Sequence, residues 1–517
     1  MLAKRQLRCW VLNVVEPQSS GLGGSGFMLY ADAETNDIIA YEGRETAPQA
    51  MPKDAFVDGG KPLGFMDASS SGMAVGVPGL LAMLARAHRQ HGTMPWAQTF
   101  EPAISLAEAG FVVSPRMAMS IARHPFLFEQ DPHGGFYDKE GTPLSAGTIY
   151  KNEALAETFR RIAKQGSDVF YRGALADDIV TRVRSSPRTL PGGMGALTQQ
   201  DLADYRAGAR PPLCAPYRVW RVCGVPLPSS GGIALLQILQ LLEPFPLASM
   251  DETARMHVLA EAMRLAYRDR AAFLGDDAFS LVPVARLLSP DYLDRRRQLL
   301  RADKALDTVQ AGSPEGEDTE QDGQEVERES TTHLSIIDRY GNAVALTSSI
   351  GPSFGSGLRV GGFYLNGELT DFAFVDGGDK TTNSIEGGKR PLSSMSPTIV
   401  FDSEGRVRLV LGSAGGVHII AYVARVLMEV LDGGKAIQEA LSARHYVKKG
   451  QGRTLLLEEH HKGRQGQDSA LVRELRRKNH GIESKKMTSG LQAIYVDDRG
   501  VLWGGVDPRR EGLAVGQ

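Results

Sequence analysis

Thr331 is the residue whose type and place in the chain most directly indicate chemistry. It follows residues 310–330, an acidic, glycine-bearing stretch with almost no large apolar side chains, for which we expect a mobile loop. Thr331 also begins TTHLSIID, which alternates like a strand. Cleavage before Thr331 would leave an α-amino group, with a reference pKa of about 7.7–8.0, beside its hydroxyl. One residue could then act as nucleophile and base.

The alternative for residues 310–330 is an ordinary interdomain linker. A linker alone would carry no chemistry, whereas a slack loop would let the carbonyl before Thr331 bend over the attacking hydroxyl. The segments that follow decide between the two.

The pattern of elements predicts a layered α+β core. Alternating strands around polar turns predict hairpins at 27–42, 331–350, 396–416 and 491–505. Apolar residues at helical spacing predict helices within 77–92, 101–111, 155–166, 251–301 and 417–434. Residues 216–232 read as a strand ending in a Pro/Gly/Ser turn, with an apolar helix from Ile233.

Composition narrows the function. The chain has 517 residues, 42% of them hydrophobic, and a formal net charge of -3, which provides no basic field for nucleic acid. Three cysteines, Cys9, Cys214 and Cys223, form neither an even disulfide set nor a metal cage, so we expect packing alone to hold the fold. The redox compartment stays open. The first seventeen residues lack a signal-peptide cleavage site, and we expect a helix there.

Two motifs that would indicate a cofactor site or a catalytic serine lack the helix that each requires after it. The G-x-G-x-x-G pattern at Gly21, Gly23 and Gly26 precedes a hairpin rather than a helix, which disfavours a dinucleotide site. The G-x-S-x-G pattern around Ser353 lacks the helix that a serine-hydrolase elbow needs. No metal-ligand spacing occurs, so we expect neither a metal nor a cofactor.

Seven ordered blocks resemble the γ-glutamyltransferase (glutathione hydrolase) family of N-terminal-nucleophile enzymes over nearly the whole chain. They are EPQSSGLGGSGF at 16–27, GRETAP at 43–48, PSSGG at 228–232, TTHLSIID at 331–338, LNGELTDF at 365–372, KRPLSSMSPT at 389–398 and GSAGG at 412–416. The resemblance implies a four-layer αββα sandwich. It also implies a precursor cut between Ser330 and Thr331 into a large region, 1–330, and a small region, 331–517, which together form one intertwined domain.

The resemblance implies a role for each site residue. Thr331 would be the nucleophile and Ser349 its hydroxyl partner. Arg44 would hold the substrate α-carboxylate, a task suited to a guanidinium fork. The remaining implied residues are Asp371 for the α-ammonium group, Glu368 beside it, Ser393 and Ser394 for the α-carboxylate, and Gly415 and Gly416 for the oxyanion hole.

Each role has a structural alternative. Arg44 could form a surface ion pair, and Ser393 with Ser394 could cap a turn. Asp371 could be a strand-end acid, and the glycine pair could simply start a helix. We assign His333 a structural hydrogen bond and no catalytic role.

The implied activity is cleavage of the γ-glutamyl amide of glutathione and related compounds through an ester on Thr331, with water, an amino acid or a dipeptide as acceptor. A glutaryl-type (cephalosporin) acylase is the first alternative, but it would not need Asp371. A catalytically impaired relative, which would stay uncut, is the second. The family resemblance implies a periplasmic or extracellular enzyme that works as a heterodimer of its own two fragments.

The chain departs from the family pattern at several places. Gly351 and Gly367 stand where many members have asparagine, and the segment from Phe372 to Gly388 is short. We expect a smaller cover over the pocket and therefore hydrolysis rather than transfer. The export signal and first helical segment usual in the family are missing before residue 16, so either the true start lies upstream or the protein is a shortened version.

Overall fold

Two antiparallel sheets face each other in the centre of the molecule. A computed structural model describes residues 2–131, 134–314, 330–374, 381–459 and 465–516. The first sheet has the order β10 (Thr332–Ile337), β11 (Ala343–Ser349), β1 (Ser25–Ala31), β2 (Ile38–Gly43) and β7 (Gly208–Arg210). The second has the order β20 (Leu502–Val506), β19 (Gln492–Val496), β15 (Val407–Gly412), β14 (Thr398–Phe401), β9 (Trp220–Gly224) and β8 (Leu213–Tyr217).

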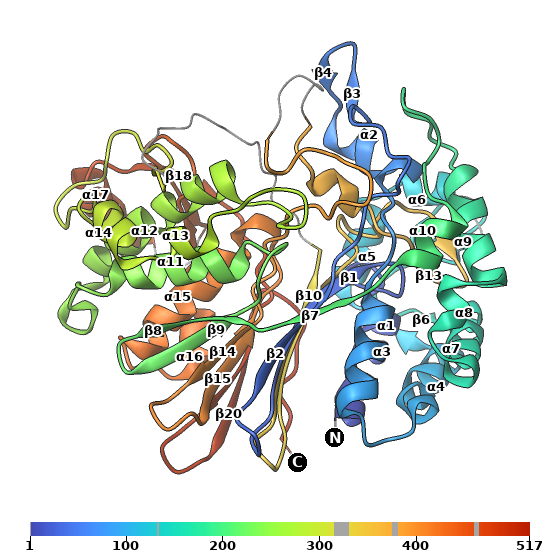
Figure 1. Ribbon diagram of the computed structural model, residues 1–517, viewed down its shortest axis with the longest axis horizontal. Helices are drawn as coiled ribbons and strands as arrows, with labels where there is room; N and C mark the ends of the chain where they lie inside the picture. The colour runs from blue at the N-terminus through green and yellow to red at the C-terminus, as the bar shows by residue number, and fades with distance from the viewer. Residues whose placement is uncertain (1, 132–133, 315–329, 375–380, 460–464, 517) are drawn as a thin grey trace.

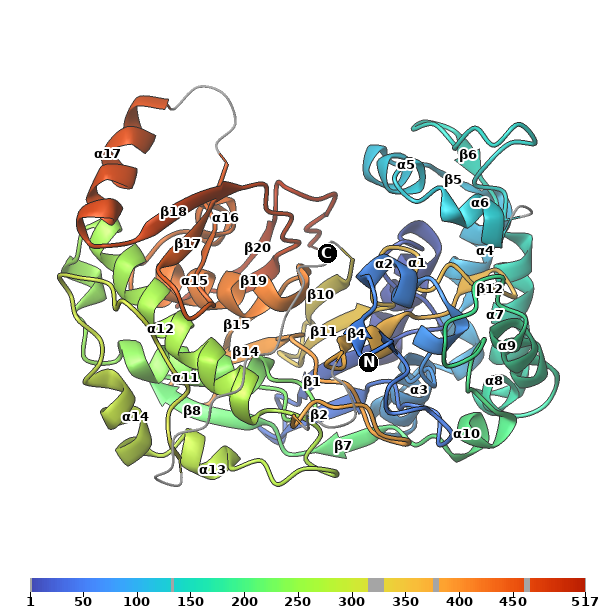
Figure 2. The same ribbon diagram turned by 90° about the horizontal axis from the view of Figure 1, so that it is seen from above.

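Helices cover the outer face of each sheet (Figure 1). On the six-stranded sheet these are α11 (Gly231–Leu242), α12 (Glu252–Phe273), α15 (Ile419–Leu431) and α16 (Ile437–Ser442). On the five-stranded sheet they are α1 (Leu2–Val15) and α3 (Leu80–His91). Figure 2 shows the two helical layers on opposite sides of the strands. The fold is the four-layer αββα sandwich that the family resemblance implies.

Strand β1 shows why the layers hold together. Its side chains are all buried and alternate between two cores. Phe27 and Leu29 belong to the core between the sheets, while Met28 and Tyr30 pack on the helices α1 and α3. Because the side chains of a strand point to opposite faces in turn, one central strand contributes to both cores. Each fully buried large apolar side chain contributes about 1.5–3 kcal/mol.

The remaining elements lie around this sandwich. A helical group beside α1 contains α4 (Glu101–Ala109), α5 (Pro115–Ala122), α6 (Phe126–Gln130), α7 (Glu153–Gln165), α8 (Asp168–Tyr171), α9 (Ala174–Arg184) and α10 (Gln199–Asp204). The other helices are α2 (Phe65–Ser69), α13 (Val284–Leu287), α14 (Pro290–Arg297) and α17 (Gln465–Arg477), with short 3-10 turns η1 (Gly72–Ala74), η2 (Trp96–Thr99), η3 (Leu247–Ser249), η4 (Glu368–Asp371) and η5 (Gly416–His418). Small strands are β3 (Val57–Asp58), β4 (Lys61–Pro62), β5 (Phe111–Val112), β6 (Ile149–Tyr150), β12 (Arg359–Val360), β13 (Phe363–Tyr364), β16 (Tyr446–Val447), β17 (Thr454–Glu458) and β18 (Gly481–Lys485).

The hairpins and main helices expected from the sequence are present. The four hairpins are β1–β2, β10–β11, β14–β15 and β19–β20, and the expected helices correspond to α3, α4, α7, α12 and α15. The expected N-terminal helix is α1. Most of the acidic loop, residues 315–329, lies outside the described residues, as do residues 375–380 of the short cover segment. Among the described helices, none combines the length and apolar character needed to cross a membrane.

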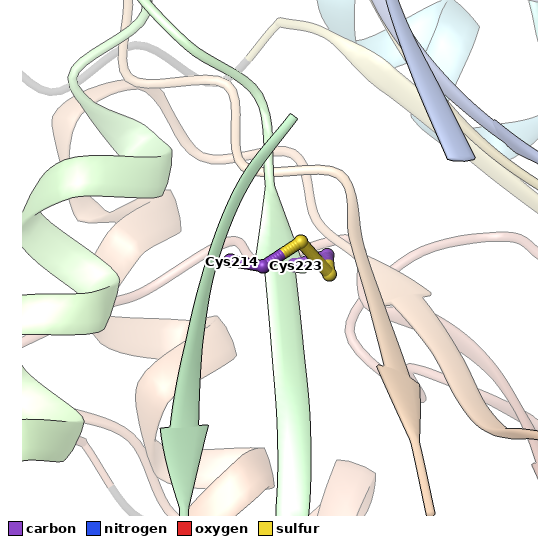
Figure 3. The surroundings of a disulfide bond; sticks show 2 residues. All are labelled: Cys214 and Cys223. Carbon is purple, nitrogen blue, oxygen red and sulfur yellow. A yellow bond between two sulfur atoms is a disulfide. The ribbon is translucent and has the colours of Figure 1, made fainter. Parts of the chain in front are cut away.

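The expectation that packing alone holds the fold is wrong. Cys214 on β8 and Cys223 on β9 lie directly opposite each other and form a disulfide (Figure 3). Cys9 is buried and unbonded, and burial raises its thiol pKa to about 12. The odd cysteine count concealed the pair, because cysteines on adjacent strands of a hairpin can pair whether or not the third cysteine has a partner.

We predict that alkylation of free thiols will detect this disulfide and that the bond stabilises the hairpin. Thiol alkylation of the denatured chain should label one cysteine before reduction and all three after it. Replacing both Cys214 and Cys223 with Ser should lower the free energy of unfolding by about 2–3 kcal/mol, because the bond closes a short loop in the unfolded chain. Three labelled thiols without reduction would contradict the disulfide.

Candidate active site

Thr331 lies immediately before β10, and three hydrogen bonds hold it in place. Its N–H donates to the Ser19 carbonyl at 3.3 Å, and its hydroxyl donates to Ser349 Oγ at 3.2 Å. Its own carbonyl accepts from Arg510 Nη1 at 2.8 Å. Thr331 is buried, and its φ of 91° is a conformation that β-branched residues rarely adopt. Such a conformation persists only where the surroundings impose it.

Ser349 reaches Thr331 through the register of the β10–β11 hairpin. Thr332 pairs with Ser348, so the residue before β10 faces the last residue of β11. The Ser349 hydroxyl also accepts from the Gly351 N–H at 3.0 Å. Because it accepts from Gly351 and Thr331, Ser349 Oγ orients the Thr331 hydroxyl at a fixed point.

The peptide between Ser330 and Thr331 is held against the segment before β1. The Ser330 hydroxyl donates to the Gln18 carbonyl at 2.9 Å, and Ser330 is fully buried. Together with the bond from Thr331 to Ser19, this contact fixes the main chain on both sides of the expected cleavage point.

Arg44 follows directly after β2 and lies among carboxylates. It is 0% exposed, so it is not a surface ion pair. Its guanidinium donates to Glu368, to Asp371 Oδ2 at 2.5 Å and to Glu45 Oε2 at 3.3 Å. Burial lowers the pKa of Arg44, and burial raises the pKa of Glu45 to about 7 against the opposing effect of Arg44. Three carboxyl groups therefore surround one guanidinium, and a further cation bound here would offset the excess of carboxyl groups.

Gly351 connects this charged cluster to the nucleophile. Its φ is 87°, and a Cβ added there would lie 3.2 Å from the Gly367 carbonyl carbon and 3.3 Å from Glu368 Cγ. Gly351 also donates to Ser349, the partner of Thr331. It therefore lies between Ser349 and Glu368, the carboxylate that accepts from Arg44.

The loop that carries Ser393 and Ser394 also touches Arg44, through main-chain groups. The Pro391 carbonyl accepts from Arg44 Nε at 3.0 Å. Ser393 Oγ accepts from the Met395 N–H at 3.2 Å, as the turn-capping alternative expects. Ser394 Oγ accepts from Arg270 Nη2 at 2.9 Å, and burial lowers the pKa of Arg270 to about 10.

Gly415 and Gly416 form the turn between β15 and α15. Their φ values are 131° and 58°, and a Cβ on Gly415 would lie 2.6 Å from the ring of Tyr422. Only glycine fits there, and the turn brings main-chain N–H groups to a helix N-terminus, where negative charge is stabilised. A Cβ on Gly490 would lie 2.9 Å from Arg510 Cδ and 3.1 Å from Ala414 Cβ, so the Arg510 stem lies beside the residue that precedes this turn.

His333 lies near Thr331 in the chain but is not a base. Its ring nitrogens bond Thr347 Oγ1 at 2.8 Å and Ser335 Oγ at 3.0 Å. Burial lowers its pKa to about 3, so the ring is neutral at physiological pH. No group of residues suited to binding a metal occurs in the described part of the chain.

Sequence reasoning missed four residues that contact this region. Ser19 and Gln18 bond the expected cleavage point through carbonyls, Arg270 bonds Ser394, and Arg510 bonds Thr331. None has a local pattern that signals its contact. The only trace is that Gln18 and Ser19 fall inside the block EPQSSGLGGSGF.

Comparison with known proteins agrees with this arrangement. The family model described as gamma-glutamyltranspeptidase matches residues 9–517. A glutathione hydrolase proenzyme of Bacillus subtilis (strain 168) is 34% identical over 98% of this chain and 86% of its own. The acylase ACY 1 proenzyme of Pseudomonas sp. (strain SE83) is 30% identical over 98% of this chain and 87% of its own.

Among solved structures, the cephalosporin acylase from Bacillus halodurans superposes with a TM-score of 0.83 at 26% identity, over 98% of this chain and 89% of its own. The sequence match and the sandwich fold agree, and the chain belongs to the gamma-glutamyltranspeptidase family.

Proposed function

We propose that this protein is a self-processing γ-glutamyl hydrolase that uses Thr331 as nucleophile and base. The observation that carries the proposal is the buried, strained Thr331 with its hydroxyl bonded to Ser349, joined through Gly351 to the charged cluster around Arg44. The family and its relatives named as glutathione hydrolases support the same activity.

In the first step, the chain would cut itself before Thr331. Thr331 Oγ1 attacks the Ser330 carbonyl carbon, the C–N bond breaks, and the acyl group moves from nitrogen to oxygen. Water then hydrolyses the ester, which leaves a carboxylate on Ser330 and an α-amino group on Thr331. Strand β1 from the first fragment pairs with β11 from the second, so the two fragments would stay together as a heterodimer.

In each turnover, the new α-amino group would take the proton of the Thr331 hydroxyl as it attacks the γ-carbonyl of the substrate. The turn at Gly415 and Gly416 would supply N–H groups to the oxyanion. The leaving amine takes a proton, and water or an amino acid or dipeptide acceptor removes the γ-glutamyl group from Thr331.

The charged cluster would recognise the amino acid head of the substrate. The α-carboxylate would bind Arg44, with help from Ser393 and Ser394. The α-ammonium group would bind Asp371 beside Glu368, which offsets the excess of carboxyl groups around Arg44. Glutathione and related γ-glutamyl compounds have this head.

A glutaryl acylase is the second candidate, because an acylase relative and an acylase structure cover nearly the whole chain. A glutaryl group has no α-ammonium, so it would leave the carboxyl groups of Asp371 and Glu368 without a cation from the substrate. The charge of the cluster therefore favours γ-glutamyl substrates.

The disulfide supports a location outside the reducing cytoplasm. A bond between Cys214 and Cys223 persists in an oxidising compartment such as the periplasm or the extracellular space. We propose this location for the mature enzyme.

Replacing Thr331 with Ala should abolish both self-cleavage and turnover, because the chain then lacks the attacking hydroxyl. The readout is gel analysis of fragments over time and release of p-nitroaniline from γ-glutamyl-p-nitroanilide. Thr332→Ala is the matched control, since it removes the neighbouring hydroxyl and should cut normally. Cleavage of Thr331→Ala at the wild-type rate would refute the assignment.

Replacing Asp371 with Asn should raise KM for γ-glutamyl-p-nitroanilide by about 30-fold, the usual order for the loss of a buried charge partner. KM for glutaryl-p-nitroanilide should change little, because that substrate has no ammonium group. Steady-state kinetics with the two substrates measure the difference. Equal changes in both KM values would show that Asp371 does not bind the α-ammonium.

The pH profile should report the Thr331 amine. It accepts a proton only when neutral, so kcat/KM should fall as pH drops through an apparent pKa of about 7.7–8.0. His333, with a pKa of about 3, should not contribute, and His333→Gln should keep the same acidic limb. An acidic limb that disappears in His333→Gln would contradict the proposal.

A further inference from the structure

The C-terminal segment returns to Thr331 and completes a ring of contacts around its main chain. Arg510 donates to the Thr331 carbonyl, and the next residue, Glu511, accepts from the Arg116 N–H at 3.0 Å. Arg116 Nη1 donates to Ser19 Oγ at 3.1 Å, and the Ser19 carbonyl accepts from the Thr331 N–H. Three segments distant in sequence, those of Ser19, Arg116 and Arg510–Glu511, thus form a closed ring of hydrogen bonds with Thr331.

Three groups bond Thr331 in the described structure, and of these only Arg510 bonds its carbonyl oxygen. Ser19 holds the N–H and Ser349 holds the hydroxyl. The φ of 91° at Thr331 is unfavourable for a β-branched residue, so it needs anchors on both sides of the Cα. Without the carbonyl anchor, the peptide can relax toward negative φ, which would move the hydroxyl from its position beside Ser349.

The Arg510 side chain is itself fixed. Its Nε donates to the Thr488 carbonyl at 3.3 Å, and its stem passes Gly490, where a Cβ would lie 2.9 Å from Arg510 Cδ. The same Cβ would lie 3.1 Å from Ala414, the residue before the Gly415 turn. Gly490 therefore lies between the Arg510 stem and Ala414, with no space for a side chain.

We infer that Arg510 is a positioning residue that holds Thr331 in its strained conformation, both for self-cleavage and for turnover. This inference rests on the proposed function. Arg510 acts through Thr331, because it bonds the carbonyl of the proposed nucleophile.

The test compares Arg510→Gln, Arg510→Lys and a matched control with the wild type. Arg499→Gln is the control, since Arg499 lies in the same C-terminal region but is exposed and pairs with Asp497. Each protein is purified, its melting temperature is measured, and fragment formation is followed by intact mass. Loss of a hydrogen bond from a charged donor should slow self-cleavage by about tenfold or more in Arg510→Gln.

Arg510→Lys keeps the charge and most of the stem, so it should cut at an intermediate rate with an unchanged melting temperature. The cleaved fraction of either variant should show a lower kcat for γ-glutamyl-p-nitroanilide with an unchanged KM. A purely structural role would instead lower the melting temperature and leave the kcat of the folded, cleaved enzyme intact. If Arg510→Gln fails to fold, the self-cleavage rate of Arg510→Lys tests the inference: an intermediate rate supports it, and the wild-type rate contradicts it.

Wild-type rates of cleavage and turnover in the Arg510 variants would overturn the inference while leaving the proposed function in place. A wild-type chain that never cuts would instead overturn the proposed function. The two failures are therefore distinguishable.

Discussion

The main chain of Thr331 is the constraint around which the site is arranged. A β-branched residue at a φ of 91° is held by Ser19, Ser349 and Arg510, which come from the start, the middle and the end of the chain. Pairing within the five-stranded sheet makes this possible, because β11 lies between β1 and β10 and so brings the residues before Ser25 close to the start of β10. Local strain at a functional residue is stable only inside such a rigid frame.

The charged cluster around Arg44 differs from the region of Thr331 in that its charge balance matters for binding. Arg44 is buried with Glu45, Glu368 and Asp371, and the pKa of Glu45 is raised to about 7 by burial. A zwitterionic head brings an anion for the arginine and a cation for the carboxylates, whereas a glutaryl group brings the anion alone. Relatives with acylase names share the fold, so we propose that selectivity between the two substrate classes depends on this cluster rather than on the sandwich.

Periodicity and turn residues predicted the hairpins and main helices of an α+β core well, since these elements have strong local patterns, whereas the four-layer arrangement came from the family resemblance. The turn at 338–342 even places Thr331 opposite Ser349, because hairpin register follows from the turn. The roles of Arg44 and Asp371 came from family resemblance, and the structure brings the two side chains together. The Cys214–Cys223 bond was missed because the odd cysteine count argued against a pair, and the contact of Arg510 was missed because no local pattern relates it to Thr331.

The most direct test of the account is the mass of the acyl-enzyme. The processed protein is mixed with a γ-glutamyl substrate, quenched rapidly in acid, and both fragments are weighed intact and then mapped by peptide. The account predicts two fragments, the smaller beginning at Thr331 and carrying one γ-glutamyl group on that residue. An uncut folded chain, or a γ-glutamyl group on any other residue, would contradict it.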